Sequence, residues 1–408
     1  MKVFISDLHI GDGSAKDDFV FDDEFEKLVS ELNHEKDVEL IIVGDGFELL
    51  ESVPVREMGL VSFEELLINF PVETFDLIVK KHSKALMALR NLAKRHRLIY
   101  IVGNHDYYMM KNAKLKEKIQ EFFEKIEIVP MYYDRDWGIL AIHGNQFDVI
   151  NKFSVDRRSG HLIPPLGDYI TRYMMINFDK HFEDAPKILK EYDNVKPFFE
   201  VFHWFEHVME AYDVGVNILE FWTKTFLEMF KTAEAKWWMK SNFPKTHWLS
   251  KVFINRIGGM KLGEFLVRTI AKLRSARKFD YLYTYSKKIL SGRRQLKKTD
   301  LIGYVDDLPE IDYSNLNGMF FGHTHNLNMK ILKIKDRYCF YSNCGSWKPS
   351  VQKAENEKKT GFYRKAELGY SMIEKHGEEL EIKTGIINKL VNRLDLPLKE
   401  RGTGEVLL

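Results

Sequence analysis

Five short apolar runs, each followed at once by a polar motif, dominate the pattern of this 408-residue chain. The runs are rich in β-branched and aromatic residues and are bounded by glycine or polar residues, which is typical of buried strands. Open α/β sheets bind ligands at the carboxyl ends of their strands, so strands in one or two stacked sheets would bring the five motifs to one rim. The motifs are Asp7-Leu8-His9, Gly44-Asp45, Gly103-Asn104-His105-Asp106, His143-Gly144 and Gly322-His323-Thr324-His325.

The rest of the pattern predicts helices early in the chain and hairpins late. Apolar residues at helical spacing predict helices over 21–34, 73–96 and 114–125. Short apolar runs between turn residues predict strands over 330–334, 338–342, 361–373 and 379–384. Residues 386–394 return to helical spacing, and we expect a short docked helix there. Together these elements predict two packed sheets flanked by helices.

The five motifs supply seven side chains that bind metals through oxygen or nitrogen. Seven donors are too many for one closed tetrahedral site, whereas a carboxylate shared by two ions about 3.5–4 Å apart would divide them into two open sites. Mixed histidine, aspartate and asparagine ligation suits manganese, iron, zinc or cobalt and disfavours calcium and magnesium. The seven residues are Asp7, His9, Asp45, Asn104, His143, His323 and His325.

The motifs resemble those of the calcineurin-like metallophosphoesterases, whose pattern is D-x-H, G-D, G-N-H-[DE], an isolated H-G and G-H-x-H. The resemblance covers about residues 1–150 and 301–385 and implies an α/β fold, a four-layer α/β/β/α sandwich. The implied ligand sets are Asp7, His9, Asp45 and His325 for one metal, and Asp45, Asn104, His143 and His323 for the other. Asp45 would bridge two divalent ions, with manganese favoured and iron, zinc or cobalt as alternatives.

The resemblance also implies a reaction. A hydroxide that bridges two divalent ions is a nucleophile near neutral pH, and the ions neutralise charge on the phosphate. The leaving oxygen needs a proton, which in this family commonly comes from the histidine of G-N-H-D, here His105. Asp106 beside it is expected to orient or charge the imidazole. The nine histidines outside the motifs are interpreted as structural or surface residues.

A long insertion separates the fourth motif from the fifth. His143 and His323 are 180 positions apart (323 − 143), so about 151–300 should form a helical insertion, a cap over the metal rim. Its first half carries aromatic residues at helical spacing. These residues either pack helices on each other and on the catalytic domain, or form an apolar pocket or membrane-facing surface for a lipid-like tail.

The second half of the insertion is basic. From Lys261 to Lys298 there are twelve lysines and arginines against Glu264 and Asp280, a net charge of +10 (12 − 2). A solvated helix face is the usual explanation of a charge run. Beside a phosphoesterase site, however, such a field would attract an anionic substrate or anionic lipid headgroups. Three interleaved tyrosines at 281, 283 and 285 would also allow single-stranded nucleic acid to stack.

Composition narrows the class of protein. The formal charge of +1 implies no global attraction to nucleic acid or membranes, and 45% hydrophobic residues supply core for two domains. Cys339 and Cys344 are the only cysteines, which fits a reducing compartment. We expect no signal peptide, no membrane-spanning segment and a cytoplasmic location, extended to peripheral contact at the inner membrane face through the insertion.

Three stretches suggest a branch of the family. Gly44–Glu48, His143–Asp148 and Asn343–Trp347 are similar to the branch that contains UDP-2,3-diacylglucosamine pyrophosphohydrolases. This similarity favours a phosphodiester or pyrophosphate bond in a bulky anionic substrate, linked to a nucleotide or a lipid. Arg157 and Arg158 are candidates for clamping a distal phosphate.

The sequence therefore predicts a dinuclear metal-dependent phosphodiesterase or pyrophosphohydrolase. Its catalytic domain comprises 1–150 and 301–385, the insertion 151–300 and the tail 386–408. Two alternatives stay open. One is a single-strand nuclease of the same superfamily, which we do not favour, and the other is a phosphatase-like scaffold without turnover.

Overall fold

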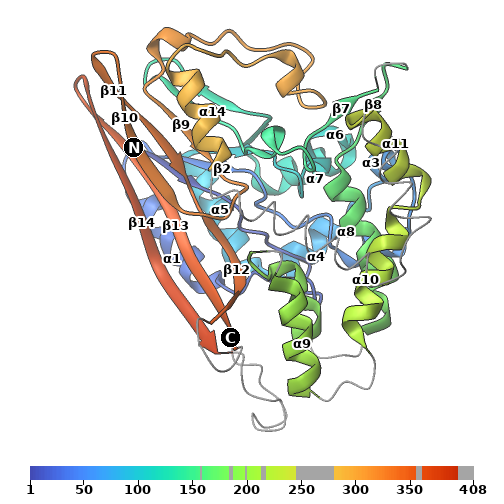
Figure 1. Cartoon of the computed structure of the whole chain (residues 1–408). Coiled ribbons are helices and arrows are strands. Elements are labelled where there is room, and N and C mark those ends of the chain that lie inside the picture. The colour runs from blue at the N-terminus through green and yellow to red at the C-terminus, as the bar shows by residue number, and fades with distance from the viewer. Residues whose placement is uncertain are drawn as a thin grey trace. The chain divides into compact units, whose positions relative to one another are not determined.

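The chain forms two compact units, each described here by itself. The computed structural model describes residues 1–156, 159–182, 187–197, 200–212, 217–244, 280–354 and 361–393 (Figure 1). Unit 1 comprises Met1–Ser154, Asp280–Lys348 and Glu367–Asn388, and unit 2 comprises Val155–Phe279, Pro349–Ala366 and Lys389–Leu408. The predicted insertion thus overlaps unit 2, but its residues 280–300 lie in unit 1.

The first sheet contains three of the five predicted motif strands. β1 (Lys2–Ile5), β2 (Glu39–Val43), β3 (Arg97–Ile101) and β4 (Ile126–Val129) are parallel neighbours in that order. β13 (Phe362–His376) runs antiparallel to β1, and β12 (Ser346–Lys353) and β14 (Glu379–Arg393) pair with β13. Each motif strand of this sheet is apolar after its first residue, because that part is buried on both faces.

The second sheet contains the other two motif strands. Its order is β10 (Asn328–Ile334), β11 (Arg337–Asn343), β9 (Gly318–Phe321), β6 (Ile139–Ala141) and β5 (Tyr132–Asp134), with β6 and β9 parallel. Side chains from both sheets form one core, in which the rings of Phe4 and Phe320 stack with centroids 3.7 Å apart. The two packed sheets that the pattern predicts are therefore confirmed.

Helices flank this sandwich. α5 (Ser83–Arg95) packs against β3, and α1 (Asp22–His34), α4 (Glu73–Lys81) and α7 (Ala113–Phe123) pack against α5. α14 (Tyr281–Leu290) packs against β9 and β11. The fold is thus a mixed α/β sandwich, as predicted. The shorter helices of unit 1 are α2 (Val53–Glu57), α3 (Phe63–Ile68), α6 (Tyr108–Lys111), and the 3-10 turns η1 (Asn145–Phe147), η5 (Lys298–Asp300) and η6 (Tyr313–Asn315).

The single helix predicted over 73–96 is wrong, because α4 ends at Lys81 and α5 begins at Ser83. The break lies at His82, whose φ of −109° and ψ of 38° are not helical. Its buried imidazole bonds Asp17 through Nε2 (2.8 Å) and Asp22 through Nδ1 (2.9 Å). These polar contacts outweigh helix continuity, and the hydrophobic pattern cannot reveal them.

The His82 contacts predict a pH dependence of stability. Burial alone would lower the pKa of His82, but Asp17 and Asp22 outweigh burial and raise this pKa from 6.5 to about 9. The folded protein keeps this proton up to about pH 9, whereas the unfolded chain loses it near pH 6.5. The stabilisation is therefore complete below pH 6.5 and is lost as the pH rises to 9, on the order of 2–3 kcal/mol. Chemical denaturation across this range should show the loss, and His82→Leu should abolish that part of the pH dependence; an unchanged slope would contradict the assignment.

The helix predicted over 386–394 is also wrong, because β14 continues through Arg393. β13 is 15 residues long and offers a backbone partner along this stretch. Ile386, Ile387 and Val391 are β-branched and suit a strand. Apolar residues on both faces of one strand thus imitate helical spacing.

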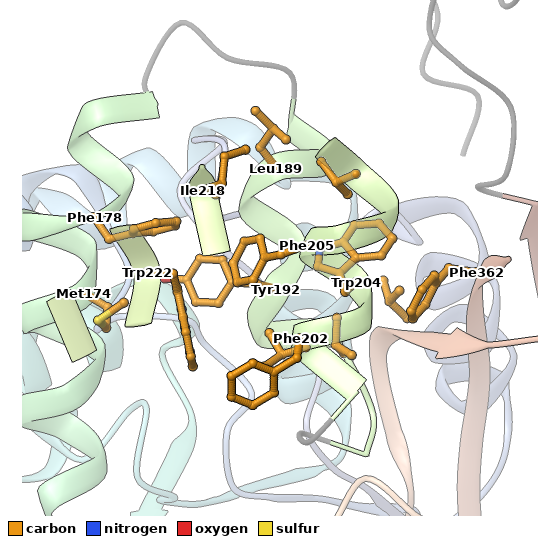
Figure 2. Packing of buried hydrophobic residues seen from close by; sticks show 14 residues of the cluster. Met174, Phe178, Leu189, Tyr192, Phe202, Trp204, Phe205, Ile218, Trp222 and Phe362 are labelled. Carbon is orange, nitrogen blue, oxygen red and sulfur yellow. The ribbon is translucent and has the colours of Figure 1, made fainter. Parts of the chain in front are cut away.

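Unit 2 is built mainly from helices around an aromatic core. Its elements are β8 (Leu162–Ile163), which pairs with β7 (Ser154–Val155), α8 (Leu166–Asn177), η2 (Asp179–Phe182), η3 (Lys187–Asn194), α9 (Val201–Tyr212), α10 (Ile218–Met229) and α11 (Ala233–Asn242). Figure 2 shows the rings of Tyr192, Phe205 and Trp222 close together. The ring centroid of Phe205 lies 5.8 Å from that of Tyr192 and 5.7 Å from that of Trp222. Phe202, Phe205 and Trp222, taken from the predicted helical stripes, are buried in this core. These aromatic residues therefore pack on each other within the unit.

Candidate metal centre

The ends of the five motif strands meet at one place in unit 1. Within the first sheet the N–H of Asp7 donates to the carbonyl of Gly44 (3.1 Å), and within the second the N–H of Gly322 donates to the carbonyl of His143 (2.9 Å). Between the sheets, the N–H of His323 donates to Oδ2 of Asp7 (2.9 Å). The rim predicted from strand ends is therefore formed by loops that bond directly to one another.

The backbone at this rim is strained. Among the described residues eight non-glycine residues have positive φ, and five of them are predicted ligands, with φ between 49° and 67°. Such left-handed backbone costs roughly 1–3 kcal/mol per residue and persists where the surroundings enforce it. The five residues are Asp7, His9, Asp45, His323 and His325. The strain turns their side chains to a shared centre instead of along the strands.

Close approach of the loops explains two glycines of the motifs. A Cβ at Gly44 would collide with the imidazole of His143, and Gly44 has a φ of +82°. A Cβ at Gly322 would collide with the side chains of Ser6 and Asp7. Only glycine lets the two sheets bring their ligands this close.

Six of the seven predicted ligands form two clusters. Asp7, His9 and His325 present ligand atoms within 4.8 Å of one another, and so do Asp45, His143 and His323. Each cluster contains three of the four residues of one implied ligand set: the first lacks Asp45 and the second lacks Asn104. The seventh residue, Asn104, follows β3 and contributes a buried side-chain oxygen.

The polar atoms of the centre fit metal ions. Among the candidate ligands, four buried side-chain atoms make no hydrogen bond to the described residues, two from each predicted set. Two of them lie close to other candidate ligands, Nε2 of His143 at 3.1 Å from Oδ2 of Asp45 and Oδ1 of Asp7 at 3.2 Å from Nε2 of His325. Such orphaned groups cost about 1–3 kcal/mol each unless another ligand satisfies them. The atoms are Oδ1 of Asp7, Nε2 of His9, Oδ1 of Asn104 and Nε2 of His143. Oxygen and imidazole nitrogen are the donors that manganese, iron, zinc and cobalt accept.

The comparison with known protein families assigns the fold. Residues 3–203 match the model of the calcineurin-like phosphoesterase family. A calcineurin-like phosphoesterase domain covers this segment. The family consists of hydrolases that act on phosphoesters and bind divalent metals, so the domain indicates metal-dependent phosphoester hydrolysis. The match contains the first four motifs, whereas Gly322–His325 lies beyond it. No curated protein matches the chain.

Two of the candidate ligands, Asp7 and Asp45, are buried carboxylates with a lowered pKa. Burial alone would raise the pKa of Asp7, but the charges of His325 and His143 outweigh burial and lower this pKa to about 2. Burial likewise opposes ionisation of Asp45, while His143 and His105 hold its pKa well below the usual range. Both carboxylates are therefore anionic at neutral pH, the state that binds cations.

Glu48 contacts both a candidate metal ligand, His9, and the candidate general acid, His105. Its Oε2 contacts Nδ1 of His9 (2.7 Å), and its Oε1 contacts Nδ1 of His105 (2.8 Å). Burial lowers the pKa of His105, but Glu48 and Asp45 raise it to about 10. The only sequence signal for Glu48 is its place in the stretch Gly44–Glu48, which did not identify its role.

Asp106 accepts hydrogen bonds from neighbouring loops and strand β3 and does not contact the imidazole of His105. Its Oδ2 accepts hydrogen bonds from the N–H of Gly46 (3.0 Å) and the hydroxyl of Tyr100 (2.7 Å), and its Oδ1 accepts from the N–H of Gly103 (2.6 Å). The carboxylate in contact with His105 is Glu48, and not Asp106 as we expected. Adjacency in sequence misled because the backbone turns between the two side chains.

A second carboxylate, Asp148, contacts a ligand of the other cluster. Its Oδ2 lies 3.2 Å from Nε2 of His323. Such outer carboxylates fix the orientation of metal-bound imidazoles. Arg157 and Arg158, our candidates for a distal phosphate, lie outside the described residues.

The two carboxylates predict site-selective effects. Glu48→Gln should weaken the site that contains His9, and Asp148→Asn the site that contains His323, each by roughly 10- to 100-fold in metal affinity. Titration calorimetry with Mn²⁺ would resolve the two sites, and each variant is the matched control for the other. Equal weakening of both sites by either variant would contradict these assignments.

Proposed function

We propose that this protein is a dinuclear metal-dependent phosphohydrolase that cleaves a phosphodiester or pyrophosphate bond, with His105 as general acid. The observation that carries the proposal is the pair of clusters with orphaned atoms, Asp7–His9–His325 and Asp45–His143–His323. When bound, two divalent ions, with Mn²⁺ favoured over iron, zinc or cobalt, would supply an activated water and neutralise phosphate charge.

The chain's own residues supply the proton. Glu48 engages Nδ1 of His105, so Nε2 is the nitrogen left to protonate a leaving oxygen. The His105 ring lies beside the His9 ring, with centroids 4.8 Å apart, which places the acid next to the first ligand set. The side chain of His105 is 19% exposed, so a substrate can reach it.

The substrate class is proposed from sequence similarity. Gly44–Glu48, His143–Asp148 and Asn343–Trp347 are similar to the UDP-2,3-diacylglucosamine pyrophosphohydrolase branch, which favours a bulky nucleotide- or lipid-linked ester. The insertion at about 151–300 is our candidate for the cap that selects it. No helix in the described part of the chain is long and apolar enough to cross a membrane.

The nuclease alternative loses support from the contacts of the tyrosines. Lys330 Nζ lies 4.1 Å from the ring centre of Tyr283, and Tyr285 stacks on Phe147 at 4.6 Å with Arg294 at 4.8 Å. These rings are already engaged by their own chain. Of the twelve basic residues, six (Lys261, Arg268, Lys272, Arg274, Arg277 and Lys278) lie outside the described residues. Arg294 and Lys298 pair with Asp300 and Asp307.

A substrate panel tests the proposal. The protein, loaded with Mn²⁺, Fe²⁺, Zn²⁺ or Co²⁺, is assayed on phosphomonoesters, phosphodiesters, nucleotide diphosphate conjugates and single-stranded DNA. We expect turnover of diesters or diphosphate conjugates and none of DNA. Preference for DNA would favour the nuclease, and no turnover with any metal would favour the scaffold.

A further inference from the structure

One edge of unit 1 exposes an apolar surface. Eleven large apolar side chains are exposed among the described residues, and five of them lie on β10, β11 and β14. The five are Met329, Ile331, Tyr338, Ile386 and Ile387. β10 ends the second sheet, while β14 pairs only with β13 in the described part of the chain (Figure 1). Both strands are therefore sheet edges.

Strand register shows which way these side chains point. Ile331 pairs with Phe340, a member of the core between the sheets, so Ile331 shares the inward face of the second sheet. Leu380 and Ile382 of β14 pack against the same core, and Ile386 lies on their face of the strand. Yet Ile331 is 55% exposed and Ile386 44%. The layer between the sheets is thus open at this edge.

β14 has few of the features that protect an edge strand. It is 15 residues long, where strands usually have about 3–10, and it contains no proline. Its charges are divided along its length: Glu379 and Glu381 lie in the first half, Lys389 and Arg393 in the second. A second β14 running antiparallel about Gly385 would place Glu381 opposite Lys389, although Glu381 is already paired with Lys383 and His376 of its own chain.

We propose that β14 pairs antiparallel with β14 of a second copy, with Gly385 on the two-fold axis, so that the first sheet continues across a homodimer. In this register Glu381 lies opposite the partner's Lys389, and Thr384 lies opposite the partner's Ile386. Each Ile386 then lies diagonal to its symmetry mate, within reach of contact. The pairing gives the edge of β14 backbone partners from the second copy and covers part of the open apolar layer.

Sedimentation velocity of the full chain over a range of concentrations tests the dimer. Wild-type protein should shift from monomer to dimer as concentration rises. Glu381→Lys or Lys389→Glu alone places like charges opposite each other twice in the symmetric dimer and should weaken dimerisation by roughly tenfold. The double variant Glu381→Lys/Lys389→Glu should restore it.

A second pair of variants tests the apolar contact. Ile386→Lys should also weaken the dimer, whereas Ile68→Lys, at a position 73% exposed on α3, should leave it unchanged. Circular dichroism checks that each variant is folded. A wild type that stays monomeric at every concentration overturns the proposal. So does a dimer that is insensitive to the single charge reversals, or one that the double variant fails to restore.

Discussion

Replacing Asp45 with alanine should remove metal from both sites at once. Asp45 is buried, its Oδ2 lies 3.1 Å from Nε2 of His143, and its backbone carbonyl accepts from the N–H of His9. It therefore belongs to the second cluster and its backbone contacts His9 of the first, which is why we propose it as the bridging carboxylate. Metal ions contribute several kcal/mol to phosphoryl transfer, so activity should fall by roughly 10³- to 10⁵-fold. Elemental analysis of the purified variant and steady-state rates measure the two effects.

Asp37 offers a matched control for this experiment. It is also an aspartate with left-handed backbone, with a φ of 52°, but it is exposed and lies before β2 instead of after it. Asp37→Ala should change neither metal content nor rate, which separates loss of a ligand from the effect of placing alanine in left-handed backbone. An Asp45→Ala protein that still binds two ions would show that Asp45 does not bridge the sites.

The strand ends could be predicted because apolar runs and their polar termini are local features of the sequence. The five runs before Asp7, Asp45, Asn104, His143 and His323 are strands, parallel within each sheet, and the structure brings the motifs together at one rim. The candidate ligands follow from residue type and position after a strand.

The outer contacts could not be predicted in the same way. Glu48 contacts His105 across 57 positions and Asp148 contacts His323 across 175, and such pairs depend on how the loops turn. The left-handed backbone of Asp7 and His9 is likewise imposed by contacts with the second motif loop. His82 shows the same limit, since its two carboxylate partners lie 60 and 65 positions away.

Replacing His105 with alanine should separate proton transfer from metal binding. His105 belongs to neither cluster of the predicted ligands but groups with His9 and Glu48. If it acts as the acid and not as a ligand, both metals should remain. Esters with poor leaving groups should react roughly 10²- to 10⁴-fold more slowly, because they need the acid. An activated aryl ester needs no proton and should lose little. Rates measured over a series of leaving groups show the difference. His34→Ala, at an exposed histidine, is the control.

Glu48 makes the test of His105 sharper. If Glu48 acts on catalysis by holding His105, then Glu48→Gln should reduce the rate with poor leaving groups in the wild type but not further in His105→Ala. The part of its effect that runs through His9 should persist in both backgrounds as weaker metal binding. Equal losses for activated and poor leaving groups in His105→Ala would remove the acid role. Full additivity of the two substitutions would instead show that Glu48 acts on the metal ligand alone.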